Sequence, residues 1–416
     1  MILQDKNVVY VTREIERALG MLPSKNYIIV SNATPYGQSI KKQYPDFVTL
    51  IENSAGKLLG TTELLGHSAT KLLLSKIQAS SEASVFVFKN TLRVENAATA
   101  NGWKLLNPAS SLSERVENKL SQIDWLAELG RTYLPPHSIQ TAKNILWENK
   151  PFIIQWAHGH TGDGTTLVRS REELSAWQEK FPERMARVTK YVSGPSFTVN
   201  AVVTADKILT GNISYQITGI QPFTDGEFST IGNDWGAAQS LLDQSEAAFI
   251  WKMAQEIGTK LQKDGWRGLF GIDVIRDDTQ KKIYLIEVNA RQPASTTFES
   301  LLQEEVRGTD ANGSGITTFE AHLQALLGLF VTEDLIQISD GAQIVQRVTK
   351  NIHGVSDDIR NSLESAGYRV VAYQNTDYNS DLLRIQSPHA IMEAHGIFNA
   401  HGKEIEEMVA GSRPQI

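Results

Sequence analysis

The chain of 416 residues contains no cysteine. This absence excludes disulfide bonds, zinc sites built on thiolates and a cysteine nucleophile. No apolar run approaches the ~20 residues that a helix needs to span a bilayer, so no membrane partner is expected. Basic residues are in slight deficit, with 40 Lys and Arg against 47 Asp and Glu, which gives no support for a nucleic-acid partner. The first residues show no basic segment followed by an apolar one, so the predicted location is the cytoplasm.

Three familiar catalytic or nucleotide-binding motifs are also missing. No Gly-x-Gly-x-x-Gly follows the first apolar segment, no P-loop ends in Gly-Lys-Ser/Thr, and no Gly-x-Ser-x-Gly is found. What is present is an ordinary globular composition, with 41% hydrophobic and 21% charged residues. A chain of this length is expected to form two to four domains with ample cores.

Short apolar segments alternate with polar helical segments over the N-terminal part of the chain. The apolar segments are 27–30, 47–51, 85–88 and 103–106. This alternation predicts an α/β domain with a parallel sheet flanked by helices. A single helix is predicted over 112–129, with Gly130 as its C-cap. From about residue 331 onward, strand-like and helical segments without a chemical motif predict a small α+β module.

Two apolar strand-like segments carry polar side chains where a buried strand is expected to carry none. Asp273 lies in the first segment, and Glu287 and Asn289 lie two residues apart in the second. Because side chains alternate along a strand, Ile283 and Leu285 are predicted to share one face with Glu287 and Asn289.

The turn between these segments determines whether the acids meet. A three-residue loop over 278–280 would pair Asp277 with Lys281 and would place Asp273 and Glu287 on one face, as diagonal neighbours. Converging carboxylates repel by roughly 4 kcal/mol at about 4 Å and an effective dielectric near 20, unless a cation lies between them. Hard oxygen ligands of this kind suit Mg²⁺ shared with a substrate phosphate. The alternative is a solvated strand end with incidental acids.

A glycine-rich segment over 158–165 is the second informative feature. Its glycines allow backbone N–H groups to approach an anion closely, and the hydroxyls of Thr161 and Thr165 add donors. The segment lies between two predicted strands, unlike a P-loop. Two alternatives are a hairpin tip without a ligand and a zinc pair formed by His158 and His160, for which no third ligand is apparent.

Taken together, the glycine-rich segment and the paired acids resemble the ATP-grasp superfamily of carboxylate–amine ligases. The resemblance implies an ATP-grasp fold, α/β and α+β, with a Rossmann-like N-terminal domain over 1–112, an ATP-grasp domain over 113–330 and a C-terminal α+β module over 331–416. Within the ATP-grasp domain it implies a flap subdomain over about 135–192 and a metal-site subdomain over about 193–330.

The same resemblance implies that ATP and Mg²⁺, with Mn²⁺ as an alternative, are the cofactors. Lys119 matches the first ATP-contacting lysine, and Gln155 stands at the position of the second. Arg291 matches an arginine that contacts phosphate or the carboxylate substrate, and it is the expected catalytic residue. The implied metal ligands are Asp273, Glu287 and Asn289. The other implied nucleotide contacts are His160, Thr161, Gly162, Gly164 and Thr165 of the flap and Lys190, Tyr191 and Val192 of the adenine-binding hinge.

Three positions depart from the family pattern. Gln155 brings no charge, Thr189 stands where the hinge often has glutamate, and Ser196 stands where an acid often holds the ribose. These departures are compatible with a divergent nucleotide pose, with help from another cation such as Lys190, or with weakened use of ATP.

The predicted function is therefore ATP- and Mg²⁺-dependent ligation. A small-molecule carboxylate, such as an amino acid, would be activated as an acyl phosphate and joined to an amine. The alternatives are carboxyl transfer of the biotin-carboxylase type and a nucleotide-binding sensor or scaffold that has lost turnover. A homodimer is left open, and the sequence does not identify the carboxylate or the acceptor.

Overall fold

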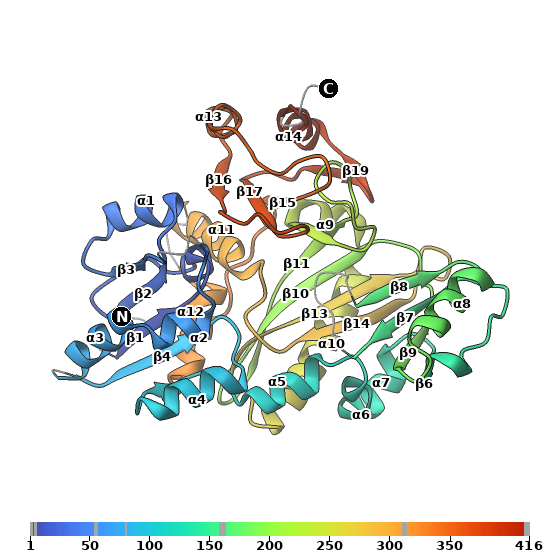
Figure 1. Cartoon of the computed structure of the whole chain (residues 1–416), viewed down its shortest axis with the longest axis horizontal. Helices are drawn as coiled ribbons and strands as arrows, with labels where there is room; N and C mark the ends of the chain where they lie inside the picture. Colours follow the sequence, from blue (N-terminus) through green and yellow to red (C-terminus); the bar gives the residue numbers. More distant parts are fainter. Residues whose placement is uncertain are drawn as a thin grey trace.

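The computed structural model describes residues 3, 6–53, 57–79, 81–157, 164–309 and 314–411. Within these ranges the chain forms a five-stranded, an eight-stranded and a four-stranded sheet, together with a two-stranded ribbon. Figure 1 shows the five-stranded sheet at one end of the molecule, the eight-stranded sheet in the middle and the four-stranded sheet at the other end. None of the described helices is long and apolar enough to cross a membrane.

The N-terminal domain is a parallel sheet in the order β3-β2-β1-β4-β5. Its strands are β1 (Asn7–Val11), β2 (Tyr27–Asn32), β3 (Val48–Ile51), β4 (Ala83–Val87) and β5 (Lys104–Leu105), and its helices are η1 (Ile15–Ala18), α1 (Pro35–Gln43), α2 (Thr61–Gly66), α3 (Ser68–Gln78) and α4 (Leu92–Ala100). Both faces are buried: Val9 and Val85 belong to one core, and Val8 and Phe86 to the other. A parallel sheet buried on both faces confirms the predicted α/β domain.

The eight-stranded antiparallel sheet has the order β14-β13-β10-β11-β12-β15-β17-β16. Its strands are β10 (Ser196–Val203), β11 (Ile208–Thr218), β12 (Thr230–Asp234), β13 (Gly268–Arg276), β14 (Ile283–Asn289), β15 (Ala342–Arg347), β16 (Arg369–Ala372) and β17 (Asp381–Ser387). Its helices are α9 (Trp235–Leu241), α10 (Gln244–Lys263), α11 (Thr296–Thr309) and α12 (Thr318–Leu326). Val199 of β10 and Ile257 of α10 share the core on one face, whereas Val202 of β10 and Ala321 of α12 pack on the other.

The sheet runs without a break into the C-terminal module, because β12 pairs with β15. The remaining elements of that module are α13 (Asp357–Ser365), β18 (Met392–Ala394), β19 (Ile397–Phe398) and α14 (Ala400–Ala410). Its core residues, such as Ile385 and Val409, belong to the same cluster as Ile257 of α10. The predicted domain limits therefore stay predictions, and the large sheet crosses the limit at residue 331.

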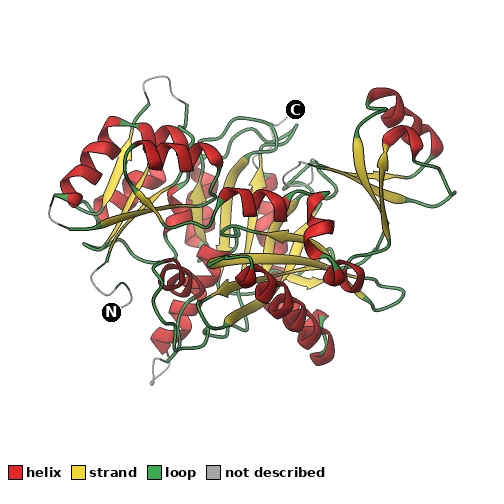
Figure 2. Cartoon of the chain, turned by 90° about the horizontal axis from the view of Figure 1, so that it is seen from below, coloured by secondary structure: helices red, strands yellow, loops and turns green. Residues whose placement is uncertain are grey.

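The four-stranded antiparallel sheet has the order β6-β9-β7-β8 and stands out from the body of the molecule (Figure 2). Its elements are β6 (His137–Thr141), η2 (Ala142–Asn144), β7 (Phe152–Trp156), β8 (Thr165–Val168), α8 (Arg171–Lys180) and β9 (Met185–Lys190). Ile154 and Val188 pack with Leu174 of α8 on one face of this sheet. The residues between them along each strand, which include Gln155 and Arg187, point to the opposite face.

Three short helices replace the single helix predicted over 112–129. They are α5 (Ser110–Glu117), α6 (Ser121–Leu126) and α7 (Glu128–Tyr133). The Asn118 side chain accepts hydrogen bonds from the N–H groups of Leu120 and Ser121, which ends one helix and starts the next. Ala127 has a positive φ of 52°, and Gly130 lies inside α7. The prediction of one helix was wrong, and the break places Lys119 outside a regular helix.

Candidate functional site

Asp273 and Glu287 lie directly opposite each other on strands β13 and β14. Asp277 pairs with Lys281 as predicted, because its carbonyl accepts the Lys281 N–H at 2.7 Å, but its own N–H donates to the carbonyl of Lys282 at 2.8 Å. Lys281, with a positive φ of 56°, is therefore an extra residue, and the register predicted beyond it was wrong. This extra residue alone would put the acids on opposite faces. The register shifts between Asp273 and Val274, so that Ile286 is an extra residue on β14. This β-bulge returns Glu287 to the face of Asp273.

The bulge also changes the faces along β14. Leu285 pairs with Val274, whereas Glu287 pairs with Asp273 and Asn289 with Gly271. Ile283 and Leu285 therefore point into the core beneath the sheet, while Glu287 and Asn289 point to the other side. The prediction that these four side chains share one face was wrong. The face of the sheet opposite Ile283 and Leu285 therefore carries the polar side chains of Asp273, Glu287 and Asn289, and we call it the site face.

Asp273 is at the centre of the hydrogen bonds of this group. Its carboxylate accepts hydrogen bonds from Thr198 Oγ1 at 2.7 Å and from Asn289 Nδ2 at 3.0 Å. Burial, followed by the nearby charge of Glu287, raises the pKa of Asp273 to about 6. Two carboxylates on directly opposite residues of one sheet face favour a shared proton or a shared cation.

The described residues hold no group of three or more His, Cys, Asp and Glu side chains that could bind a metal. A cation between Asp273 and Glu287 would therefore be completed by the amide oxygen of Asn289, by water or by substrate oxygens. Mg²⁺ is commonly held in this way, by one or two carboxylates together with substrate phosphates. The donor set fits Mg²⁺ and does not suit zinc.

Lys119 is brought to the same place from the break between α5 and α6. Its Nζ lies 2.7 Å from Glu287 Oε2, and its side chain is almost completely buried. Its backbone N–H donates to the carbonyl of Ala157, just after β7, at 3.3 Å. Lys119 therefore joins the carboxylates of the large sheet to the end of β7 in the small sheet.

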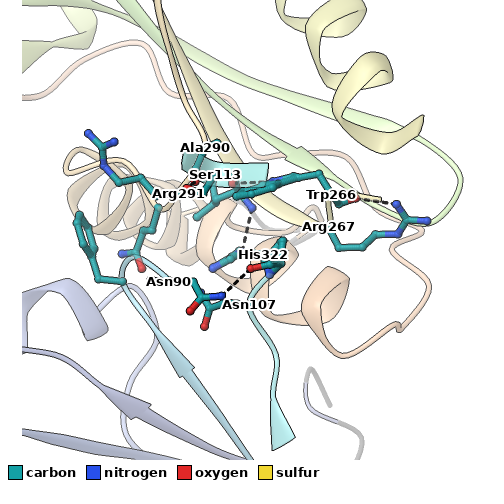
Figure 3. A pocket seen from close by; sticks show the side chains of 12 residues that line it. Asn90, Asn107, Ser113, Trp266, Arg267, Ala290, Arg291 and His322 are labelled. Carbon is teal, nitrogen blue, oxygen red and sulfur yellow. Dashed lines mark hydrogen bonds between the residues drawn. The ribbon is translucent and has the colours of Figure 1, made fainter. Parts of the chain in front are cut away.

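Arg291 follows β14 and is directed to Glu117 at the end of α5. Its Nη1 lies 2.5 Å from Glu117 Oε1, and Lys89 of the N-terminal domain binds the other oxygen of Glu117 at 2.6 Å. Arg291 also lines a small pocket between the two domains, in which Ser113 Oγ donates to the carbonyl of Ala290 at 2.6 Å (Figure 3). Arg291 is thus held beside the acids by an ion pair.

Gln155, Thr189 and Arg187 lie on the face of the four-stranded sheet, or small sheet, that is opposite the Ile154 and Leu174 core; we call it the inner face. Gln155 lies on β7 opposite both Thr165 of β8 and Arg187 of β9, and its Nε2 donates weakly to Thr165 Oγ1 at 3.4 Å. All three inner-face side chains are buried. Arg187 was not singled out as a site residue from the sequence. A charged residue between Ala186 and Val188 was the available signal.

The other predicted hinge and flap residues are placed as follows. Lys190 forms an ion pair with Asp277 at 3.4 Å, and its side chain is 43% exposed, so it is not brought to Glu287. Tyr191 is half-buried and Val192 is buried. The carbonyl of Gly164 accepts a hydrogen bond from the Trp156 N–H. The predicted contacts His160, Thr161 and Gly162 lie outside the described residues.

Comparison with known proteins places this arrangement in a class. A family model described as an ATP-grasp domain matches residues 116–295. A comparison with curated protein sequences found no match. Residues 116–295 are therefore an ATP-grasp domain, with the acid pair on its large sheet and Gln155 on its small sheet.

Solved structures extend this likeness beyond the matched domain. Carboxyaminoimidazole ribonucleotide synthase from Aspergillus clavatus, complexed with ATP, is 15% identical with a TM-score of 0.62, covering 98% of this chain and 99% of its own. L-amino acid ligase from Bacillus licheniformis is 14% identical with a TM-score of 0.61, covering 98% of both chains. The biotin carboxylase domain of Hydrogenobacter thermophilus 2-oxoglutarate carboxylase is 14% identical with a TM-score of 0.61, covering 92% of this chain and 86% of its own. These similarities show the ATP-grasp fold for nearly the whole chain.

Proposed function

We propose that this protein is an ATP- and Mg²⁺-dependent ligase that activates a small carboxylate as an acyl phosphate and joins it to an amine. The observation that carries the proposal is the half-buried pair of Asp273 and Glu287, with Asn289 beside them and Lys119 in contact. A carboxyaminoimidazole ribonucleotide synthase and an L-amino acid ligase are among the proteins of similar fold, which supports this class of reaction.

In this proposal Asp273, Glu287 and the amide oxygen of Asn289 hold Mg²⁺. When bound there, Mg²⁺ neutralises the charge that develops on the nucleotide phosphates during phosphoryl transfer. Lys119, which already faces Glu287, offers a second positive charge to the same phosphates. Because the phosphates carry more negative charge than Glu287, Lys119 is expected to turn toward them when the nucleotide binds.

Arg291 is the proposed contact of the carboxylate substrate. Its ion pair with Glu117 holds the guanidinium beside the acids and leaves other N–H donors of its fork for a second carboxylate. The substrate carboxylate would attack the terminal phosphorus and displace ADP, and the amine would then displace phosphate from the acyl phosphate and lose a proton to give the amide. Adenine is proposed to bind at the hinge formed by Lys190, Tyr191 and Val192.

The test is release of ADP and phosphate from ATP and Mg²⁺ in the presence of a panel of carboxylates, amino acids among them, together with amines. Glu287→Ala is expected to lower the rate at least about a hundredfold, because several kcal/mol of charge stabilisation are lost. Glu128→Ala, at a carboxylate that is 79% exposed on α7, is the matched control and should leave the rate unchanged. Full activity of Glu287→Ala would contradict the proposed metal site.

The same assay distinguishes two other functions. ATP hydrolysis that requires bicarbonate but no other carboxylate and no amine would favour carboxyl transfer of the biotin-carboxylase type, since a biotin carboxylase domain is among the similar structures. Binding of ATP without any release of ADP would favour a nucleotide sensor. A cytoplasmic location, a homodimer and domain limits near residues 112 and 330 also belong to the proposal, and are tested by cell fractionation, light scattering and limited proteolysis.

A further inference from the structure

Arg187 is a buried cation in the middle of the small sheet. It lies on β9, its exposed fraction is 1%, and its side chain points to the face opposite the Trp156 and Leu174 core. Guanidinium groups are rarely buried without partners, because removing the charge from water is costly. The polar contacts of Arg187 therefore require an explanation.

The described residues supply few partners for this group. Arg187 Nε and Nη1 donate no hydrogen bond to a described residue, and Arg187 forms no ion pair within 4 Å with a described carboxylate. Thr189 Oγ1, two residues along on the same face of β9, also lacks a partner among the described residues. Two neighbouring side chains on one face thus present unused donors to the same space, which is the arrangement expected of a site that receives an acceptor-rich ligand.

The position of this space follows from the backbone. Arg187 is directly opposite Gln155, and Ala157, which follows two residues later, is hydrogen-bonded to Lys119. Lys119 in turn contacts Glu287. Burial lowers the pKa of Arg187 to about 10, and the charge of Glu287 opposes that shift, so the guanidinium is near the acids and remains positive at neutral pH.

We propose that Arg187 binds the phosphates of the nucleotide and supplies from β9 the positive charge that Gln155 does not supply from β7. This inference rests on the proposed function, since it assigns a ligand contact within the same ATP site. The two positions are cross-strand neighbours, so a cation on either strand can reach the same phosphate. Lys190 does not serve this purpose, because it is out of phase with Arg187 along β9 and binds Asp277.

The test separates phosphate binding from the rest of nucleotide binding. Dissociation constants for ADP with Mg²⁺ and for adenosine are measured by calorimetry on the wild type, R187M, R187K and the double variant Q155K/R187M. R187M is expected to weaken ADP binding roughly ten- to a hundredfold, the effect of losing hydrogen bonds to a charged group, and to change adenosine binding less than about twofold. R187K, which keeps the charge, should lie between R187M and the wild type.

The double variant moves the cation to the facing strand and is expected to recover most of the lost ADP affinity. R131M, at an arginine that is 79% exposed on α7, is the matched control and should bind ADP as the wild type does. Thermal unfolding without nucleotide gives an independent readout. R187M should be as stable as the wild type or more stable, because an unpaired buried charge has been removed.

Each outcome has a definite meaning. Unchanged ADP affinity in R187M, or an equal loss of ADP and adenosine affinity together with a lower unfolding temperature, would overturn the role of Arg187 and leave the proposed function standing. If R187M does not fold, R187K and Q155K/R187M are compared with Q155M/R187Q, which has no charge at either position. Equal ADP affinities of these three variants would overturn the role of Arg187. Failure of the wild type to bind ADP or ATP would instead reject the proposed function itself, and this inference with it.

Discussion

At the scale of single residues, His322 shows how burial changes the chemistry of one side chain. It lies on α12, and its Nδ1 accepts the N–H of Leu269 at 3.0 Å. Burial lowers the pKa of His322 to about 3, against about 6.5 in an unfolded chain. Below pH 6.5 the unfolded state therefore binds a proton that the folded state does not bind. The stability that this difference provides is present above pH 6.5 and is lost as the pH falls toward 3.

We expect His322 to account for a loss of about 2 kcal/mol in the free energy of unfolding between pH 7.5 and pH 5. His322→Gln, which keeps an acceptor but cannot be protonated in this range, should remove that part of the pH dependence. The measurement is urea unfolding of wild type and variant at several pH values. His353→Gln, at an exposed histidine, is the control and should keep the wild-type dependence. Equal pH profiles for the wild type and His322→Gln would contradict the prediction.

The residues of the site differ in how far the sequence could predict their placement. The structure brings together Lys119, Glu287, Asp273 and Asn289, which stand out in the sequence as charged or polar residues beside apolar runs. Arg187 could not be placed in this way, because its relation to Gln155 depends on the pairing of two strands far apart in the chain. Local patterns report what a strand contains, whereas cross-strand neighbours depend on the register of the whole sheet.

At the scale of elements, the hairpin of β13 and β14 shows both the strength and the limit of prediction from periodicity. The expectations that the acids share a face and that Asp277 pairs with Lys281 were right, but the unbroken alternation after the turn was wrong. The second half of the hairpin has one extra residue at Lys281 and another at Ile286, so the two changes in parity cancel. A bulge leaves no reliable mark in the sequence, because its cause is the packing on both faces of the sheet.

Deletion of Ile286 tests this account of the hairpin. Leu285 already pairs with Val274 and Glu287 with Asp273, so the deletion closes the bulge and leaves each of these side chains on its present face. We therefore expect Glu287 to stay opposite Asp273, ATP turnover to fall less than about tenfold, and the free energy of unfolding to change by roughly 1 kcal/mol. The measurements are the ADP-release assay and urea unfolding.

Deletion of Gln280 in the exposed turn of the same hairpin is the matched control. It removes one residue without changing the order of residues within β14, so the effect on turnover should be less than about tenfold, with a stability loss of roughly 1 kcal/mol. Loss of turnover in the Ile286 deletion alone would show that the bulge does more than bring Glu287 to the face of Asp273.

The break between α5 and α6 is the second element with a testable role. Asn118 accepts hydrogen bonds from two backbone N–H groups there, and Lys119 is the next residue. Asn118→Ala should lower the free energy of unfolding by about 1 kcal/mol, as expected for a lost helix cap, and should raise the KM for ATP because Lys119 is held less firmly. Ser138→Ala, at an exposed residue of β6, is the control. An unchanged KM in Asn118→Ala would mean that the cap does not position Lys119.

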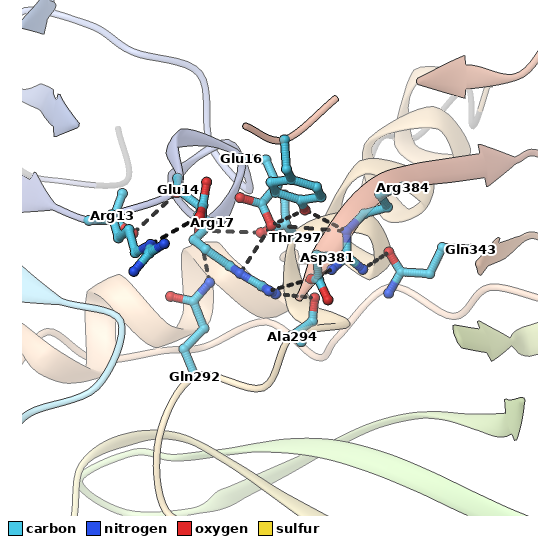
Figure 4. Close-up of polar contacts among 12 residues, drawn as sticks. Arg13, Glu14, Glu16, Arg17, Gln292, Ala294, Thr297, Gln343, Asp381 and Arg384 are labelled. Atoms are coloured by element: carbon cyan, nitrogen blue, oxygen red, sulfur yellow. Dashed lines mark hydrogen bonds and ion pairs between the residues drawn. The ribbon is translucent and has the colours of Figure 1, made fainter. Parts of the chain in front are cut away.

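At the scale of the whole molecule, a buried polar junction joins the first and last parts of the chain (Figure 4). Glu16 of η1 accepts a hydrogen bond from the Tyr373 hydroxyl at 2.7 Å and pairs with Arg17 at 3.0 Å. Arg384 of β17 donates to the same Tyr373 hydroxyl at 2.9 Å and binds Asp381 at 3.3 Å. The backbone carbonyl of Arg17 also accepts from Thr297 of α11. The N-terminal domain is thus attached to the end of the large sheet that lies opposite β14.

No sequence pattern indicated this junction, because its members are hundreds of residues apart and belong to segments without a chemical motif. The separate elements of the fold follow from hydrophobic periodicity, and so does the parallel N-terminal sheet. Their docking depends on buried charges that pair only after both parts have folded. The C-terminal module is attached to the large sheet by the pairing of β12 with β15. The junction of Glu16, Tyr373 and Arg384 predicts that this module also stabilises the N-terminal domain.

Arg384→Leu tests that coupling. The variant removes the donor to the Tyr373 hydroxyl and the second cation near the buried Glu16 carboxylate, which keeps Arg17, so we expect the free energy of unfolding to fall by about 1–3 kcal/mol. Glu16→Gln combined with Arg384→Leu removes both charges and should recover at least about 1 kcal/mol of that loss, because the two sites are coupled. Arg131→Leu, whose ion pair is on the surface, should cost less than about 1 kcal/mol. Strictly additive effects in the double variant, measured by urea unfolding, would show that Glu16 and Arg384 do not act as one buried group and that the two ends of the chain are held together by apolar packing.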